Sequence, residues 1–142
     1  MSLVKIKNNF EMPIEGYKIH TISFNGFIEI IFQDKIKDEW IYKLEIEGDY
    51  KIEIYGQIFQ FSPTNKEGYK MLIDFLQETI KVCKADKNGY FYLETQKGNS
   101  IQIEDSPYEN WHFRIYKQSI KYERQSDVTG GVGQTSIYQN KL

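Results

Sequence analysis

The fold is decided in one stretch of the chain, Ile101-Gln102-Ile103-Glu104-Asp105-Ser106-Pro107-Tyr108-Glu109-Asn110-Trp111. Its first residues alternate between apolar and polar, as in a β-strand. The proline marks an acidic turn, and a second strand begins at the tryptophan. Glu109 and Trp111 are two residues apart, so on an extended backbone we expect their side chains to share one face. The stretch therefore predicts a strand–turn–strand junction.

Period-two alternation continues on both sides of this junction and predicts further strands. The clearest run is 40–47, where one face carries Trp40, Tyr42, Leu44 and Ile46. Gly48-Asp49 separates this run from a second one over 50–55. Because glycine and aspartate favour tight turns, we expect the two runs to pair as a hairpin.

One helix interrupts the strands. Thr64 and Glu67 have the spacing of a capping box, in which each side chain bonds a free backbone N–H of the first turn. The apolar residues that follow recur at helical spacing: Tyr69, Leu72, Ile73, Leu76 and Ile80. The pattern predicts an amphipathic helix that packs on a sheet.

The chain contains two Asn-Gly pairs, Asn25-Gly26 and Asn88-Gly89. Asparagine and glycine tolerate the positive φ of a type I′ turn, so each pair predicts a hairpin. Their similar surroundings favour two related halves, with chance similarity between strands as the alternative. Residues 125–142 also leave two interpretations open: a flexible tail, or a loop over 125–134 followed by a short strand over 135–138.

These patterns predict a single domain over residues 1–142, α+β in class but mostly β. We expect about nine antiparallel strands in a curved sheet or a partly closed barrel, with one helix packed on it. Hydrophobic residues make up 40% of the chain and aromatic residues 15%. Such a composition suits a packed β-rich core, because branched and aromatic side chains pack well on a pleated surface.

Charge and cysteine content narrow the class of protein. Eighteen basic residues against 20 acidic ones give a net charge of −2, which disfavours nucleic acid as a partner. Cys83 is the sole cysteine, so no intrachain disulfide can form and a reducing compartment is expected. Lys5, Lys7 and Glu11 precede no apolar run, and no segment approaches the ~20 apolar residues of a membrane span. The sequence therefore predicts a cytoplasmic protein that does not bind a membrane.

Three features are candidates for a catalytic or ligand site. The segment 129–136 resembles a phosphate-binding loop, but Gln134 stands where that loop needs lysine, so a turn is favoured. His20 and His112 lack further ligands at metal spacing, so no metal or other cofactor is expected, and His112 is expected on an exposed face. Cys83 is interpreted as a small buried hydrophobe rather than as a nucleophile paired with a histidine.

Three further groups have both a functional and a structural interpretation. The carboxylates of the junction favour a solvated turn over acid–base catalysis. A solvated strand face is likewise favoured over phosphate binding for the basic residues Arg114, Lys117, Lys121 and Arg124. Trp40 and Trp111 fall in the apolar phase of their strands, which favours core anchors over binding-surface residues.

Three segments together resemble a family of short, uncharacterised bacterial proteins: residues 40–48, the Tyr108-Glu109-Asn110-Trp111 signature, and Gly130-Gly131. The resemblance implies a β-rich fold with an inserted helix and a paired glycine before a short last strand. Some members are suspected to be immunity proteins that neutralise a toxin made by the same cell. The chain departs from the pattern after Gly131, where the end is polar, and no catalytic residues come with the resemblance.

The leading hypothesis is a non-enzymatic bacterial protein-binding domain, an immunity protein for a cognate toxin being its most specific form. Tyrosines offer large contact area and carboxylates pair with basic groups, so Tyr108, Glu109 and Trp111 are the candidate partner-binding residues. The alternative is a small-molecule-binding protein with an aromatic-lined, barrel-like interior, which predicts a sizeable apolar cavity. An enzyme would need titratable groups in contact within a cleft, and the sequence offers no such pattern.

Overall fold

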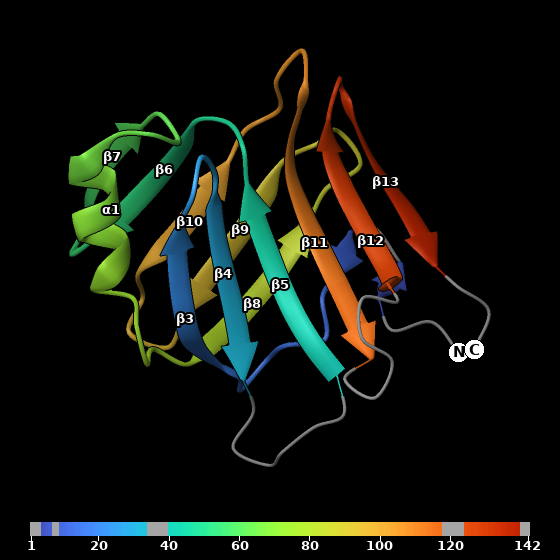
Figure 1. Cartoon of the computed structure of the whole chain (residues 1–142), viewed down its shortest axis with the longest axis horizontal. Coiled ribbons are helices and arrows are strands. Elements are labelled where there is room, and N and C mark those ends of the chain that lie inside the picture. Colours follow the sequence, from blue (N-terminus) through green and yellow to red (C-terminus); the bar gives the residue numbers. More distant parts are fainter. Residues whose placement is uncertain (1–3, 7–8, 34–39, 118–123, 140–142) are drawn as a thin grey trace.

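Two antiparallel sheets face each other in the computed structural model, which describes residues 4–6, 9–33, 40–117 and 124–139 (Figure 1). One sheet has the strand order β13-β12-β11-β5-β4-β3. Its strands are β3 (Lys18–Phe24), β4 (Ile28–Gln33), β5 (Trp40–Ile46), β11 (Glu109–Lys117), β12 (Arg124–Gly131) and β13 (Gln134–Gln139).

The second sheet has the order β1-β2-β8-β9-β10-β6-β7. Its strands are β1 (Lys5–Ile6), β2 (Phe10–Glu11), β6 (Tyr50–Ile54), β7 (Gln57–Phe61), β8 (Ile80–Ala85), β9 (Phe91–Thr95) and β10 (Ser100–Ile103). The described residues are thus mostly β with one helix, as predicted. The expected curved sheet or partly closed barrel of about nine strands is not confirmed, because these residues form 13 strands in two sheets.

The two sheets are assembled in the same way. Strands β3, β4 and β5 pair in sequence, and the chain then crosses to the other sheet, where β6 pairs with β10. Strands β8, β9 and β10 also pair in sequence, and the chain then crosses back, so that β11 pairs with β5. Each sheet therefore combines a meander from one half with strands from the other. This shared order supports the prediction of two related halves, which stays a prediction.

The first crossing corrects the expected hairpin at Gly48-Asp49. Strands β5 and β6 lie in different sheets and do not pair. The backbone N–H groups of Glu47 and Gly48 instead donate to the carbonyl of Asn110, at 2.8 and 3.1 Å. A Cβ on Gly48 would lie 2.6 Å from that of Asn110, so only glycine allows this approach. A contact distant in sequence, rather than the local turn, directs the chain here.

Alternation places the core as predicted. On β5 the side chains of Tyr42, Leu44 and Ile46 are buried, whereas Trp40 at the strand start is only partly buried. These residues and their counterparts on the facing sheet, such as Ile52 and Ile101, belong to one continuous hydrophobic cluster. Burial of this apolar surface from both sheets holds the two layers together.

Helix α1 (Lys66–Ile73) begins and ends differently from the prediction. Asn65 rather than Thr64 is its N-cap, since its Oδ1 accepts hydrogen bonds from the backbone N–H groups of Glu67 and Gly68 at 2.8 and 3.3 Å. The predicted apolar stripe extends too far, because Ile80 already begins β8. The helix contacts β3 and β7. At eight residues, it is too short to span a bilayer, and no other helix occurs in the described ranges.

The segment interpreted as a loop or tail forms two of the strands. β12 pairs with β11 on one side and with β13 on the other, so 125–134 is not a loop. The sequence pattern did not indicate β12 because Gly130 and Gly131 are unusual in a strand interior. The strand over 111–117 is confirmed by β11; 118–123 and 140–142 lie outside the described residues.

The turns are where predicted but differ in type. Asn25-Gly26 and Asn88-Gly89 do connect paired strands, yet only the glycine of each pair has a positive φ, 78° and 95°. Consecutive positive φ values, as in a type I′ turn, occur instead at Tyr55-Gly56 and Val132-Gly133. In these two hairpins the first central residue, Tyr55 or Val132, is therefore one that disfavours a positive φ.

Candidate functional site

The junction between β10 and β11 contains a β-bulge. Glu109 is opposite Gly131 and Trp111 is opposite Gly130, so Asn110 is an extra residue on β11. The bulge interrupts the alternation of side chains. Glu109 is therefore exposed while Trp111 is fully buried, and the prediction that they share one face is wrong.

Trp111 lies in the core, where its ring is 5.0 Å from that of Phe91. Its Nε1 donates a hydrogen bond of 2.9 Å to the carbonyl of Gly89. Gly130 lies directly against the indole, where any Cβ would overlap the ring. With an exposed fraction of 0%, Trp111 offers no surface to a partner and acts as an anchor of the fold.

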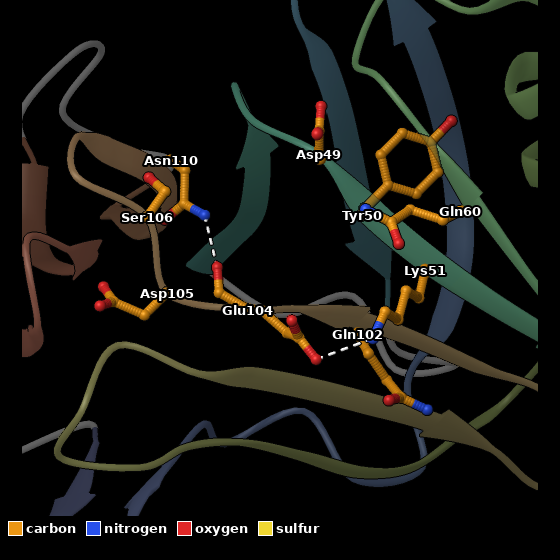
Figure 2. Close-up of a pocket in the computed structure, with 9 residues that line it drawn as sticks. All are labelled: Asp49, Tyr50, Lys51, Gln60, Gln102, Glu104, Asp105, Ser106 and Asn110. Carbon is orange, nitrogen blue, oxygen red and sulfur yellow. Dashed lines mark hydrogen bonds and ion pairs between the residues drawn. The ribbon is translucent and has the colours of Figure 1, made fainter.

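Asn110 links the two crossings between the sheets. Its carbonyl accepts from the N–H groups that follow β5, as described above, and its Nδ2 donates to the carbonyl of Glu104 at 2.7 Å. Figure 2 shows this amide pointing at Glu104 beneath the turn. Sequence reasoning missed the role of Asn110, because nothing in the local pattern marks the bulged residue.

A small hollow of about 190 Å³ opens beside Asn110 (Figure 2). Its lining is mostly polar: Asp49, Tyr50, Lys51, Gln60, Gln102, Glu104, Asp105, Ser106 and Asn110. The Nζ of Lys51 lies 2.8 Å from Glu104 Oε1, and Asp105 Oδ1 accepts from the N–H of Gly133 at 2.9 Å. The carboxylates of Glu104 and Asp105 are thus engaged in fold contacts. The volume is also below the roughly 300 Å³ of typical ligand pockets.

The outer side of the six-stranded sheet carries a charged network in two cross-strand rows. One row crosses β12, β11, β5 and β4 through Thr129, His112, Glu45 and Glu29. The next row crosses the same strands through Asp127, Arg114, Lys43 and Ile31. Glu47 and Glu109 approach the end of the first row. We name the eight ionisable residues of this group the acidic face: Glu29, Lys43, Glu45, Glu47, Glu109, His112, Arg114 and Asp127.

Arg114 is the central cation of the acidic face. Its Nη1 donates to Glu45 Oε2 at 2.6 Å and its Nε to Asp127 Oδ2 at 3.4 Å. Burial lowers the pKa of Arg114, but the Asp127 and Glu45 carboxylates outweigh that effect and raise it above its usual value. The two carboxylates are only 6% and 8% exposed. Charges so enclosed need a paired cation, which Arg114 supplies.

His112 lies among carboxylates and is 8% exposed, so the prediction of an exposed histidine is wrong. Its Nδ1 lies 3.0 Å from Thr129 Oγ1 and 3.4 Å from Asp127 Oδ1. Its Nε2 lies 3.9 Å from Glu47 Oε2 and 3.8 Å from Glu109 Oε2. Long neighbouring side chains cover the ring although the strand face is turned to solvent. No group of three or more potential ligands in the described part of the chain is arranged to hold a metal.

Exposed apolar side chains border the acidic face. Tyr108, just before Glu109, is 77% exposed, and Val132 is 59% exposed. The two lie close, because Gly131 packs against the Tyr108 carbonyl and the Val132 N–H donates to Ser106 at 2.7 Å. Val132 also has a φ of 58°, which a β-branched residue adopts only with strain. We name Tyr108 and Val132 the apolar rim.

The other sequence candidates are not brought together. Cys83 is buried on the seven-stranded sheet, where burial raises the pKa of its thiol well above the usual value. A buried, protonated thiol is a poor nucleophile. His20 is an exposed residue of β3, and its Nδ1 lies 2.7 Å from Thr21 Oγ1. Of the basic residues, Arg114 belongs to the acidic face, Lys117 lies over the ring of Trp40 at 5.9 Å, and Lys121 is outside the described residues.

Comparison with protein-family models gives no match, and neither curated proteins nor solved structures provide one. The interpretation of function therefore depends on the geometry and chemistry of the site.

Proposed function

We propose that this chain is a non-enzymatic bacterial protein-binding domain whose acidic face binds a basic surface of a partner protein. The observation that carries the proposal is the excess of carboxylates on that face. Five carboxylates, those of Glu29, Glu45, Glu47, Glu109 and Asp127, accompany two fixed cations, Lys43 and Arg114. A surface of one dominant sign attracts and orients a partner of the opposite sign.

The buried members of the acidic face give the site rigidity. Arg114 fixes Glu45 and Asp127 through hydrogen bonds on two neighbouring strands. Charges held in place before binding lose little conformational entropy when a partner arrives. Glu47 and Glu109 have side chains 41% and 64% exposed, so their oxygens remain accessible to an arginine or lysine of the partner.

The apolar rim adds apolar contact area, which the charged residues of the acidic face do not provide. Tyrosine is enriched at the energetic centres of protein interfaces, because it buries a large area with few rotatable bonds. Tyr108 sits beside Glu109, so one partner surface can cover both. Val132 fits the same role, since strained residues are retained where function requires them.

A toxin is the partner that fits the resemblance of the Tyr108–Trp111 signature and the paired glycine to suspected immunity proteins. On this proposal the chain works in the cytoplasm and neutralises a basic toxin by covering the surface that the toxin uses. The small-molecule alternative has less support. Two hollows in the described part of the chain, of about 190 and 300 Å³, are lined largely by polar and charged side chains rather than by an apolar interior.

The test is whether the chain co-purifies with a basic protein encoded by a neighbouring gene, followed by titration calorimetry of the pair. Glu109→Lys and Glu47→Lys should each weaken binding about tenfold or more, since each reverses a charge at the interface. Glu15→Lys is the matched control, an exposed carboxylate remote from the acidic face, and it should leave affinity unchanged. If both Glu109→Lys and Glu47→Lys bind the partner with the affinity of the parent chain, the proposal is wrong.

A further inference from the structure

Helix α1 contacts β7, but no strand of the described residues pairs with the outer edge of β7 in the seven-stranded sheet. Strand β7 is the last strand of that sheet, and it pairs with β6 from Tyr50–Phe61 to Ile54–Gln57 without a register shift. An edge strand presents a row of N–H and C=O groups that another strand can pair. Native proteins usually protect such edges with charges, proline or a bulge. The sequence of β7, Gln57-Ile58-Phe59-Gln60-Phe61, has no charge and no proline.

The other sheet edges are less suited to pairing. β1 has two residues, and β3 carries Lys18 and a register shift between Ile19 and Thr21. β13 is mostly polar, with two glutamines, a threonine and a serine. On β7, by contrast, Ile58 is 63% exposed. The edge at β7 therefore combines open backbone groups with apolar side chains.

Tyr55, in the turn between β6 and β7, independently marks the same end of the molecule. Its side chain is 93% exposed, and its φ is 53°. Asparagine or glycine would adopt this backbone conformation with less strain. A partner surface would explain a tyrosine that strains the turn and yet leaves nearly all of its side chain exposed.

We propose that β7 is a self-association edge, at which two copies of the chain pair antiparallel about a two-fold axis. An isologous contact requires that each residue face a compatible residue of the same strand. With Phe59 on the axis, Phe59 meets Phe59 of the second copy, Gln57 meets Phe61, and Ile58 meets Gln60. Because β7 is uncharged, no like charges oppose each other along the edge.

The nearest charges on β6 lie about 14 Å apart across the axis in this register, and they are opposite rather than like. Glu53 is opposite Ile58 on β6, and Lys51 is opposite Gln60. In the pair, each row that crosses the axis therefore begins with a glutamate of one copy and ends with a lysine of the other. The same two-fold operation places aromatic rings next to each other at Phe59, and aromatic cross-strand pairs stabilise sheets.

The edge at β7 lies far from the acidic face. Figure 1 shows β7 and α1 at one end of the molecule and β12 and β13 at the other. Pairing through β7 thus leaves Glu47, Glu109 and Tyr108 accessible in both copies. A dimer would present two acidic faces, and its existence does not depend on the proposed function.

Sedimentation velocity of the intact chain, at about 10 µM to 1 mM, tests the proposal through mass action. We expect a monomer–dimer equilibrium that Ile58→Lys weakens about tenfold or more. Ile6→Lys is the matched control, since Ile6 is 52% exposed on β1, at the opposite edge of the same sheet. This variant should dimerise as the parent does. A parent that stays monomeric throughout, or equal effects of both variants, would overturn the proposal.

A cysteine at position 59 tests the register. In Phe59→Cys the two thiols face each other across the axis, within reach of a disulfide under mild oxidation. Cys83 is buried and should not interfere. Ile6→Cys reports random collisions and should cross-link slowly. Equal cross-linking of the two variants would contradict pairing about Phe59, whereas rapid cross-linking of Phe59→Cys alone would support it.

Discussion

Gly130 lies flat against the indole of Trp111, on the strand that pairs with β11. A Cβ on residue 130 would overlap Nε1 and two carbons of the ring. The indole is fully buried and bonded to Gly89, so it cannot move aside. This contact explains why the tryptophan of the junction and the later glycine pair occur together: one fills the core and the other makes room for it.

Gly130→Ala should therefore lower the free energy of unfolding by about 3 kcal/mol, the upper range for overpacking a core. Urea unfolding followed by tryptophan fluorescence would measure this loss. Trp111→Phe provides the control in a double-mutant cycle, with circular dichroism as the signal. With the smaller ring in place, Gly130→Ala should become nearly neutral, and an undiminished loss would show that the overlap is not the cause.

Arg114 should matter more to stability than the neighbouring cation Lys43. In Arg114→Met two enclosed carboxylates, Glu45 and Asp127, lose their shared cation. We expect a loss of about 2 kcal/mol, less than for a fully buried pair because the Arg114 side chain is 20% exposed. Lys43→Met, the matched control on the next strand, should cost at most about 0.5 kcal/mol. If urea unfolding gives the same loss of unfolding free energy for Arg114→Met and Lys43→Met, the central role of Arg114 is contradicted.

The strands were predictable from sequence, because burial of one face imposes a period of two. Tyr42, Leu44 and Ile46 illustrate this, since their positions in the core follow from alternation alone. The partition into two sheets was not predictable. Gly48-Asp49 has the local signature of a hairpin, and what overrides it is a contact with Asn110, which is remote in sequence.

The candidate site was predictable only in part. Exposure of Tyr108 and Glu109 follows from a polar turn around proline. The bulge at Asn110 separates Glu109 from Trp111, and no local pattern indicates a bulge. Burial of His112 could not be predicted either, because the side chains around its ring come from three segments: Glu109 on its own strand, Glu47 after β5 and Asp127 on β12.

Val132→Asn should stabilise the fold while weakening the proposed partner binding. Asparagine accepts a φ of 58° with less strain than a β-branched residue, so we expect a gain of about 1 kcal/mol. Thermal unfolding would show a higher midpoint. Val132→Thr keeps the β-branch and should show no gain. If the apolar rim binds the partner, calorimetry should also show that the more stable asparagine variant binds less tightly.

The hydroxyl of Tyr50 is buried and has no hydrogen-bond partner among the described residues. Burial, followed by the effect of Tyr69, raises the pKa of Tyr50 above its usual value. Tyr50→Phe removes an unsatisfied polar atom and should raise the free energy of unfolding by about 1 kcal/mol. Tyr69→Phe is the comparison. Because Tyr69 donates to the carbonyl of Pro63 at 2.8 Å, its loss should destabilise instead.

Tyr92 and Glu94 should make stability depend on pH at both ends of the scale. Tyr92 donates a hydrogen bond of 2.5 Å to Glu94 Oε1. That bond is the main reason that the pKa of Glu94 is lowered, with burial acting in the opposite direction and Lys81 assisting. Burial and then the same bond raise the pKa of Tyr92.

The signs follow from linkage. A lowered carboxyl pKa contributes stability above the unfolded value of about 4.3, which is lost as pH falls through the folded pKa. A raised phenol pKa contributes stability below about 10, which is lost as pH rises through the folded pKa. Tyr92→Phe should therefore cost about 1 kcal/mol between these limits and progressively less outside them.

Urea unfolding from pH 3 to 11 would trace this profile, with Tyr90→Phe as the matched control. Tyr90 donates to Gln102, an amide that does not titrate. The loss of unfolding free energy caused by Tyr90→Phe should therefore stay the same as the pH falls into the acid range. Burial also raises the pKa of Tyr90, so both variants should share the alkaline limb. If the free-energy loss of both variants becomes smaller in acid, the cause lies outside the Tyr92–Glu94 pair. If only the loss of Tyr92→Phe becomes smaller, the cause is the hydrogen bond between Tyr92 and Glu94.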